Sequence, residues 1–387
     1  AHDFGYIGVG QLIDRTANTL QSMEALERHA GHFYNWYDTE TRAPLTRYIS
    51  TVDSGNLAGH LLTLRAGLLE VADAPIIGEQ IFLGLNDTLR ILEKAAGAPA
   101  SSLTQFKQAL LAATGTHPLT IASARVELDQ LVVCSRAVVH EIAEGQSAAG
   151  TGEAHEWAQI LNRQCEDILA EFTSLISQVV LPAPKTDMPD AAHTTEIPSL
   201  KFLAAQGNER ARHQLDTLEH LVLLTGEMSR MEYGFLFNHA QRQLAIGYNA
   251  GERRLDASYY DLLASEARLC NFVAIAQEEL PQESWFALGR MLTTAGGESA
   301  LLSWSGSMFE YLMPLLVMPT FDNTLLDQTY KAAVDRQIAY GEERGVPWGI
   351  SESGYNAVDV QFNYQYRAFG VPGLGLKRGL AEDLVIA

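Results

Sequence analysis

The sequence predicts an all-α protein in which pairs of helices form an α/α toroid. Apolar residues recur at helical spacing over most of the chain, and strand-like alternation is scarce. The helical stretches of roughly 15–25 residues follow one another in pairs, joined by loops rich in aromatic residues. A chain of 387 residues is long for one ordinary domain but suits a single large helical barrel.

The first half of the chain is predicted to be a series of helices. A helix is expected over 8–29, ended by Gly31, and the aromatic stretch 32–52 is expected to form turns. Asp53 or Ser54 is predicted to cap the next helix. Further helices are expected at 77–96, 101–114, 119–144 and 153–181.

The second half begins after a proline-rich stretch, 182–200, which we interpret as a surface linker. The stretch 232–256 alternates aromatic and polar residues, as in a short hairpin or an extended excursion. Helices are predicted over 203–230, 258–280, part of 281–292, and 324–341. The organisation expected is therefore N-terminal helices of the barrel with inserted helices (1–181), the linker (182–200), and the catalytic half of the same barrel (201–387).

Composition excludes several classes of function. The formal net charge of −20 would repel a nucleic-acid backbone, and no run of about 18 apolar residues could span a bilayer. Cys134, Cys165 and Cys270 are far apart and read as buried, reduced thiols. No histidine follows His239, and no zinc or phosphate-loop spacing occurs, so we expect neither metal nor cofactor. The chain begins with Ala1 and has no polar tail, so we expect it to be part of a longer polypeptide.

Residues 299–369 are the stretch most indicative of chemistry. Two carboxylates, Glu310 and Glu352, lie there among small residues and a high density of aromatic rings. The rings include Trp304, Trp348, Tyr355, Tyr364 and Tyr366. Aromatic faces stack on sugars, and paired carboxylates cleave glycosidic bonds. The alternative is a packed core with buried or capping acids, because aromatic residues at helical spacing are more often packing.

A third carboxylate, Glu266, is predicted two turns inside the helix over 258–280, after Tyr259 and Tyr260. An intrahelical ion pair with Arg268 or Arg253 explains Glu266 equally simply. Capping explains Asp53 without any role in chemistry.

Six segments, in order, resemble the central, glycoamylase-like domain of bacterial cyclic β-1,2-glucan synthases. Two of them contain the strings YYDLLASEAR and GISES, and the six segments are 32–45, 47–64, 246–269, 283–290, 301–319 and 347–380. The resemblance implies an (α/α)6 barrel, incomplete at its C-terminus if further helices follow residue 387. It also implies that the chain is a cytoplasmic domain of an inner-membrane synthase, with the other synthase domains as partners.

The same resemblance implies a reaction and its residues. Linear β-1,2-glucan would be cyclised by retaining transglycosylation, with Glu266 as nucleophile and Glu352 as general acid/base. Glu310 would bind a sugar hydroxyl or set the pKa of a neighbour. The remaining substrate-binding residues expected are Trp304, Tyr259, Tyr260, Asp53, Trp348, Tyr355, Tyr364 and Tyr366. Two alternatives stay open: an endo-β-1,2-glucanase of the same fold, and an inactive glycan-binding fragment.

Overall fold

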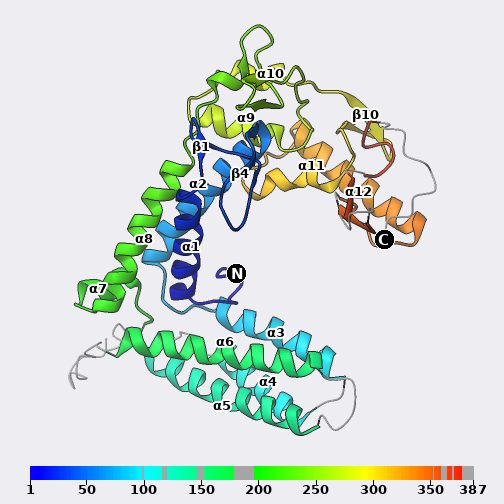
Figure 1. Ribbon diagram of the computed structural model, residues 1–387. Helices are drawn as coiled ribbons and strands as arrows, with labels where there is room; N and C mark the ends of the chain where they lie inside the picture. The colour runs from blue at the N-terminus through cyan, green and yellow to red at the C-terminus, as the bar shows by residue number, and fades with distance from the viewer. Residues whose placement is uncertain are drawn as a thin grey trace. The chain divides into compact units, whose positions relative to one another are not determined.

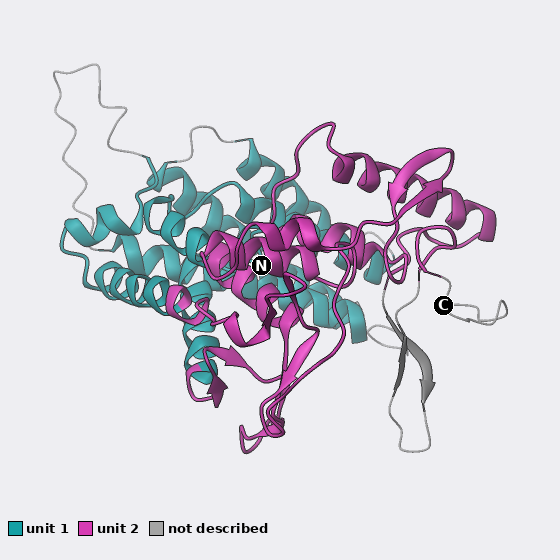
Figure 2. Cartoon of the chain, turned by 90° about the horizontal axis from the view of Figure 1, so that it is seen from above, with its two compact units in different colours: residues 1–23, 65–224 teal, residues 24–64, 225–387 magenta. Residues whose placement is uncertain are grey.

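The computed structural model describes residues 1–97, 100–115, 120–145, 152–177, 196–351, 353–358, 364–367 and 370–376. The predicted helical class is confirmed, since most of these residues are helical (Figure 1). The chain forms two compact units that are interleaved in sequence (Figure 2). Unit 1 comprises Ala1–Met23 and Arg65–Leu224, and unit 2 comprises Glu24–Leu64 and Thr225–Ala387.

Unit 1 is built from helices. They are α1 (Val9–Glu24), α3 (Gln80–Ala96), α4 (Ser101–Thr114), α5 (Ile121–Gly145), α6 (Gly152–Ile176), α7 (Leu200–Ala205) and α8 (Glu209–Met228). Helix α2 (Thr51–Asp73) contributes residues to both units. Four of the helices, α3–α6, pack against one another (Figure 1). The helices predicted at 77–96, 101–114, 119–144 and 153–181 are confirmed as these four.

Helix α3 shows how the spacing of apolar residues predicts a helix and its buried face. Leu85, Leu89 and Leu92 recur at helical spacing and are fully buried, whereas Leu83 on another face is 59% exposed. The helix ends at Gly97, which adopts a left-handed φ of 68° and donates its N–H to the carbonyl of Glu93.

A carboxylate on α5 serves the start of α4. Glu141 accepts the backbone N–H of Ser102 at 2.8 Å and that of Ser101 at 3.1 Å. Hydrogen bonds from Ser102 and Ser101 lower the pKa of Glu141 to about 2. The first turn of α4 is therefore capped by a side chain 39 positions further along the chain.

Unit 2 contains short strands. Strands β5 (Tyr48–Ser50), β8 (Gly247–Asn249) and β9 (Arg254–Leu255) form an antiparallel sheet, with Tyr48 opposite Asn249. Five two-stranded pairs accompany it: β1 (Arg28–His29) with β2 (His32–Phe33), β3 (Trp36–Tyr37) with β4 (Pro44–Thr46), β6 (Phe237–Asn238) with β7 (Gln243–Leu244), β10 (Leu292–Ala295) with β11 (Glu298–Leu301), and β12 (Ser353–Val358) with β13 (Tyr364–Arg367). The hairpin alternative for 232–256 is thus confirmed, whereas β10 and β11 were not predicted.

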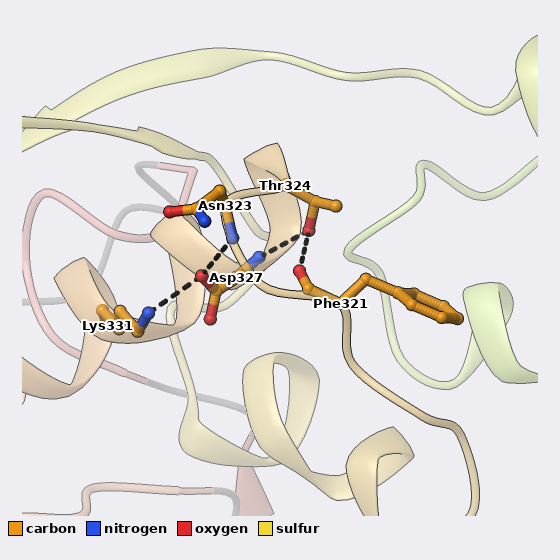
Figure 3. A network of polar contacts seen from close by, with 5 residues as sticks. All are labelled: Phe321, Asn323, Thr324, Asp327 and Lys331. Atoms are coloured by element: carbon orange, nitrogen blue, oxygen red, sulfur yellow. Dashed lines mark hydrogen bonds and ion pairs between the residues drawn. The ribbon is translucent and has the colours of Figure 1, made fainter.

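The helices of unit 2 are short except for the last. They are η2 (Gly234–Leu236), α9 (Ala267–Ala276), α10 (Glu283–Ala287), α11 (Met308–Leu312), η3 (Met313–Leu316) and α12 (Leu325–Arg344). Thr324 begins α12: its hydroxyl accepts the N–H of Asp327 at 3.2 Å (Figure 3). The Asp327 carboxylate accepts the N–H of Asn323 and the ammonium of Lys331, both at 2.9 Å.

Two apolar clusters form the core of unit 2. One includes Ile49, Ala58 and Leu269, and the other includes Leu263, Ala300 and Leu301. The segment 262–274 passes from the second cluster to the first, and it carries Glu266 at the crossing. A buried polar residue, His32, lies beside the first cluster, with its Nε2–H donating to the carbonyl of Glu232 at 2.8 Å.

The helix predicted over 8–29 ends at Glu24, and Arg28–His29 form strand β1 instead. Two other local predictions were also wrong. Helix α9 begins at Ala267, so Glu266 is its N-cap residue and does not lie two turns inside. The preceding segment instead makes tertiary bridges, Tyr259 with Ala245 and Asp261 with Gly289, and it ends at Ser265 with a left-handed φ of 49°. Helix α2 begins at Thr51, earlier than predicted, because the Ser50 hydroxyl accepts the N–H of Asp53 at 3.3 Å.

Some predictions concern features that the structure does not test. Most of the linker, residues 182–195, lies outside the described residues, whereas 196–200 lead into α7. The closed (α/α)6 barrel and the three-part domain division stay predictions. In the described part of the chain, no helix combines the length and apolar character that crossing a bilayer demands.

Candidate carbohydrate site

Glu266 is the centre of the candidate site in unit 2. Its side chain is 5% exposed at the start of α9. One carboxylate oxygen accepts the Ser265 hydroxyl at 2.5 Å, and the other accepts Asn56 Nδ2 at 3.3 Å. Asn56 belongs to α2 and lies 210 positions from Glu266 in sequence.

Glu310, on α11, lies next to this cluster and is 2% exposed. Its Oε2 accepts the backbone N–H of Ser305 at 2.8 Å and the hydroxyl of the same residue at 2.6 Å. Its Oε1 accepts the backbone N–H of Ser265 at 3.3 Å. Ser265 therefore bonds to both glutamates, through its hydroxyl to Glu266 and through its amide to Glu310.

Arg268, two positions after Glu266, is fully buried. Its guanidinium donates to the backbone carbonyl of Glu310 and, at 2.6 Å, to that of Tyr311. It also lies 5.3 Å from the ring centroid of Tyr330. Burial lowers the pKa of Arg268. The guanidinium therefore binds backbone carbonyls of α11. The alternative interpretation, in which Arg268 pairs with Glu266, did not predict these contacts.

Two of the predicted aromatic residues lie together. The rings of Tyr260 and Trp304 have centroids 5.3 Å apart and are inclined at 37°. Trp304 Nε1–H donates to Asp261 Oδ2 at 2.8 Å, which fixes the indole plane. The hydroxyl of Tyr259 accepts Asn238 Nδ2 at 2.6 Å, so this neighbour is held by a different contact. Tyr260 and Trp304 are the best platform for a sugar ring among the described residues.

Electrostatics link this platform to Glu266 and Asp53. Burial raises the pKa of Tyr260, and the nearby carboxylates of Asp53 and Glu266 add to that rise. Asp53 is exposed and accepts Asn35 Nδ2 at 3.4 Å. The predicted residues Asp53, Tyr260, Trp304, Glu266 and Glu310 are therefore brought into one neighbourhood.

The structure does not describe the side chains of four other predicted residues. Glu352 lies outside the described residues, and the side chains of Tyr355, Tyr364 and Tyr366 do so as well, although the backbones of these three belong to β12 and β13. Trp348 lies in the loop after α12 and is 54% exposed.

The chain just before residue 352 is anchored at α11. Ser351 Oγ accepts the N–H of Phe309 at 3.0 Å, and the carbonyl of Ile350 accepts the N–H of Met308 at 3.0 Å. Both donors lie in the first turn of α11, the helix that carries Glu310.

Sequence reasoning missed three residues of the neighbourhood: Asn56, Asp261 and the role of Ser265. Asn56 lies one turn after Asp53 on α2, so helical spacing from a candidate already named could have found it. Asp261 and Ser265 act through tertiary hydrogen bonds, for which the sequence holds no local signal. The described residues contain no group of three His, Cys, Asp or Glu side chains suited to a metal.

Buried carboxylates with hydrogen-bond donors, next to a pair of aromatic rings, are typical of sites that bind and process carbohydrate. Comparison with known proteins agrees. No family model matches the chain. The chain is 36% identical, over an alignment of 415 positions that includes all of it, to the cyclic beta-(1,2)-glucan synthase NdvB of Rhizobium meliloti (strain 1021). It spans 13% of the length of that protein. The predicted resemblance is confirmed: this chain is related to one segment of a cyclic β-1,2-glucan synthase.

Proposed function

We propose that this chain is the cyclising domain of such a synthase and acts by retaining transglycosylation on linear β-1,2-glucan. One observation carries the proposal. Glu266 is held by Ser265 and Asn56 near the Tyr260–Trp304 platform, in a chain related throughout its length to a segment of a glucan synthase. The (α/α)6 barrel, the three-part domain division and a place beside the other domains of a membrane-bound synthase, on its cytoplasmic side, belong to the same proposal.

Glu266 is the nucleophile in this mechanism. Its carboxylate attacks the anomeric carbon of a glucose unit, forming an ester bond while the glycosidic bond breaks. The departing glycosidic oxygen takes a proton from the general acid, for which we propose Glu352. In the second step a hydroxyl at the far end of the same glucan chain attacks this carbon and gives its proton to the Glu352 carboxylate, which restores the carboxylic acid. The ester then breaks and the Glu266 carboxylate is restored, so two inversions retain the β linkage.

Ring closure requires that the tethered hydroxyl outcompete water. Stacking on Tyr260 and Trp304 would hold the glucan and exclude solvent from one face of the intermediate. The acceptor is attached to the same molecule, so its effective concentration is set by chain length and bending. A platform next to the nucleophile thus favours cyclisation over hydrolysis.

Product analysis tests the proposal. Purified protein is incubated with linear β-1,2-glucan, and mass spectrometry distinguishes rings from linear products by the one water that rings lack. We expect rings from the wild type, none from Glu266→Gln, and a rate lowered by about 10²–10⁴-fold in Glu352→Gln. Glu342→Gln, at an exposed position on α12, is the matched control and should retain full activity.

Other products would favour the alternatives. Because ring closure also releases a linear leaving fragment, only linear products without any rings from the wild type identify an endo-glucanase and overturn cyclisation. Glucan binding without turnover, equal in the wild type and in both variants, identifies a binding fragment.

A further inference from the structure

The residues on both sides of Glu266 bind residue 310. Before it, the amide of Ser265 donates to the Glu310 carboxylate at 3.3 Å. After it, the Arg268 guanidinium donates to the backbone carbonyl of Glu310. Ser305 completes the group through its amide and hydroxyl, at 2.8 Å and 2.6 Å from Glu310 Oε2. We call Ser265, Arg268, Ser305 and Glu310 the residue-310 clamp.

The Glu310 carboxylate is already occupied by the protein. It is 2% exposed and accepts three hydrogen bonds from Ser265 and Ser305. At this exposure a sugar hydroxyl has almost no surface to approach, and opening one of these contacts to admit it would leave a buried amide or hydroxyl unpaired. Of the two roles expected for Glu310, action on a neighbour therefore fits better than direct binding of substrate.

The neighbour is Ser265, whose backbone is strained. A left-handed φ of 49° is unfavourable at a residue other than glycine, and surrounding contacts must hold it. The Glu310 carboxylate accepts the amide of this residue, and in the same conformation its hydroxyl reaches Glu266 at 2.5 Å. We propose that Glu310 is a positioning residue that orients the Glu266 carboxylate through Ser265, while Arg268 holds the backbone of the same short helix.

This inference rests on the proposed function, in which Glu266 is the nucleophile, and it adds a role for a buried acid that need not touch glucan. A misplacement of about 1 Å can lower a rate by 10²-fold. Loss of the clamp should therefore reduce kcat and leave KM nearly unchanged, because the Tyr260–Trp304 platform is not altered.

Glu310→Gln is the first variant. Its side chain has nearly the same volume, but its NH₂ group would face one of the two serines, where only an acceptor fits. We expect kcat for ring formation to fall about 10²-fold, with KM within twofold of the wild type. Ser265→Gly is the second variant: it removes the hydroxyl but adopts a left-handed φ freely. It should lower kcat without lowering Tm.

Thr324→Ala is the matched control for stability. It removes the N-cap of α12 in the same unit and leaves every residue of the clamp in place. Its Tm should fall, whereas kcat at a temperature well below Tm should not change. An equal loss of kcat in Thr324→Ala and Glu310→Gln would show a merely structural role and overturn the proposal.

Hydrogen exchange gives a readout that does not depend on catalysis. In Glu310→Gln we expect faster amide exchange at Ser265 and Ser305, and in Thr324→Ala no change at either. If the wild type makes no product, the proposed function fails, and the clamp is judged by exchange alone. Unchanged exchange at Ser265 in Glu310→Gln, or a kcat within twofold of the wild type, overturns the positioning role.

Discussion

The two units bury different kinds of side chain. In unit 1 the described buried residues include polar side chains such as Ser135 but no charged one, and charged pairs such as Lys107 with Glu93 or Arg136 with Glu166 lie at the surface. In unit 2 the buried residues include Glu266, Arg268 and Glu310. Burying charge is costly unless hydrogen bonds compensate it, so a fold retains such groups mainly where chemistry needs them. The difference is consistent with the proposal that the site lies in unit 2.

The largest effect should come from the apolar core of unit 1. Leu89→Ala, on α3, removes a fully buried side chain and should lower the free energy of unfolding by about 2–5 kcal/mol. Denaturant unfolding measures the change. Leu83→Ala, at a 59% exposed position of the same helix, should stay within about 0.5 kcal/mol. Equal effects at the two positions would contradict the apolar character of this core.

The next largest expected effect is the pH dependence of the stability that His32 contributes to unit 2. Burial lowers the pKa of His32 from 6.5 to about 4, so the folded state takes up a proton less readily than the unfolded state. Stability from His32 is therefore present above pH 6.5 and is lost as pH falls towards 4, by about 3 kcal/mol.

His32→Gln, which cannot titrate, should flatten this part of the stability profile. The measurement is thermal unfolding at a series of pH values. His213→Gln, at an exposed position of unit 1, should keep the profile of the wild type. If the stability of His32→Gln still falls as the pH is lowered over this range, groups other than His32 cause the loss.

A smaller effect is expected at the start of α12. Thr324→Ala removes the acceptor for the Asp327 amide and should cost about 1 kcal/mol (Figure 3). Thr324→Ser keeps the hydroxyl and should restore most of the loss in urea unfolding. If serine is as damaging as alanine, the methyl group and not the cap carries the effect.

The smallest expected effect is the loss of the stability that Glu141 contributes to unit 1 at low pH. Hydrogen bonds from Ser102 and Ser101 lower the pKa of Glu141 from 4.5 to about 2. The stability that this surface contact contributes is present above pH 4.5 and is lost as the pH falls from 4.5 to 2. The corresponding pH range for His32 runs from 6.5 to about 4. Glu141→Gln should unfold more readily than the wild type at pH 6 and match it near pH 2. A difference that persists at pH 2 would contradict the assignment.

The sequence predicts unit 1 better than unit 2 for a physical reason. In α3–α6 one periodic apolar face decides both the helix and its packing, so a local pattern contains the answer. In unit 2 the segment 258–266 also has helical spacing, but Asp261 accepts a hydrogen bond from Trp304 and Ser265 donates one to Glu310, both far along the chain. These tertiary contacts override local propensity, and the helix starts only at Ala267.

The candidate site shows the same division. Glu266, Tyr260 and Trp304 could be selected from residue type and resemblance, and the structure brings them into one neighbourhood. The functions of Ser265 and Arg268 could not be predicted, because each depends on a backbone atom or carboxylate of residue 310. Residue type indicates which groups can react, whereas tertiary contacts decide how they are held.

The interleaving of the units also sets an order of events during synthesis on the ribosome. The hydroxyl of Tyr48 bonds to Asp256, 208 positions later, and Asn56 bonds to Glu266, 210 positions later. At about 5–20 residues per second, the early strands must wait roughly 10–40 s for their partners to emerge. The longer segment of unit 1, Arg65–Leu224, is translated in that interval. Nascent chains halted before residue 247 should therefore contain the helical bundle, lack Glu266 and the Tyr260–Trp304 pair, and have an unpaired β5 edge.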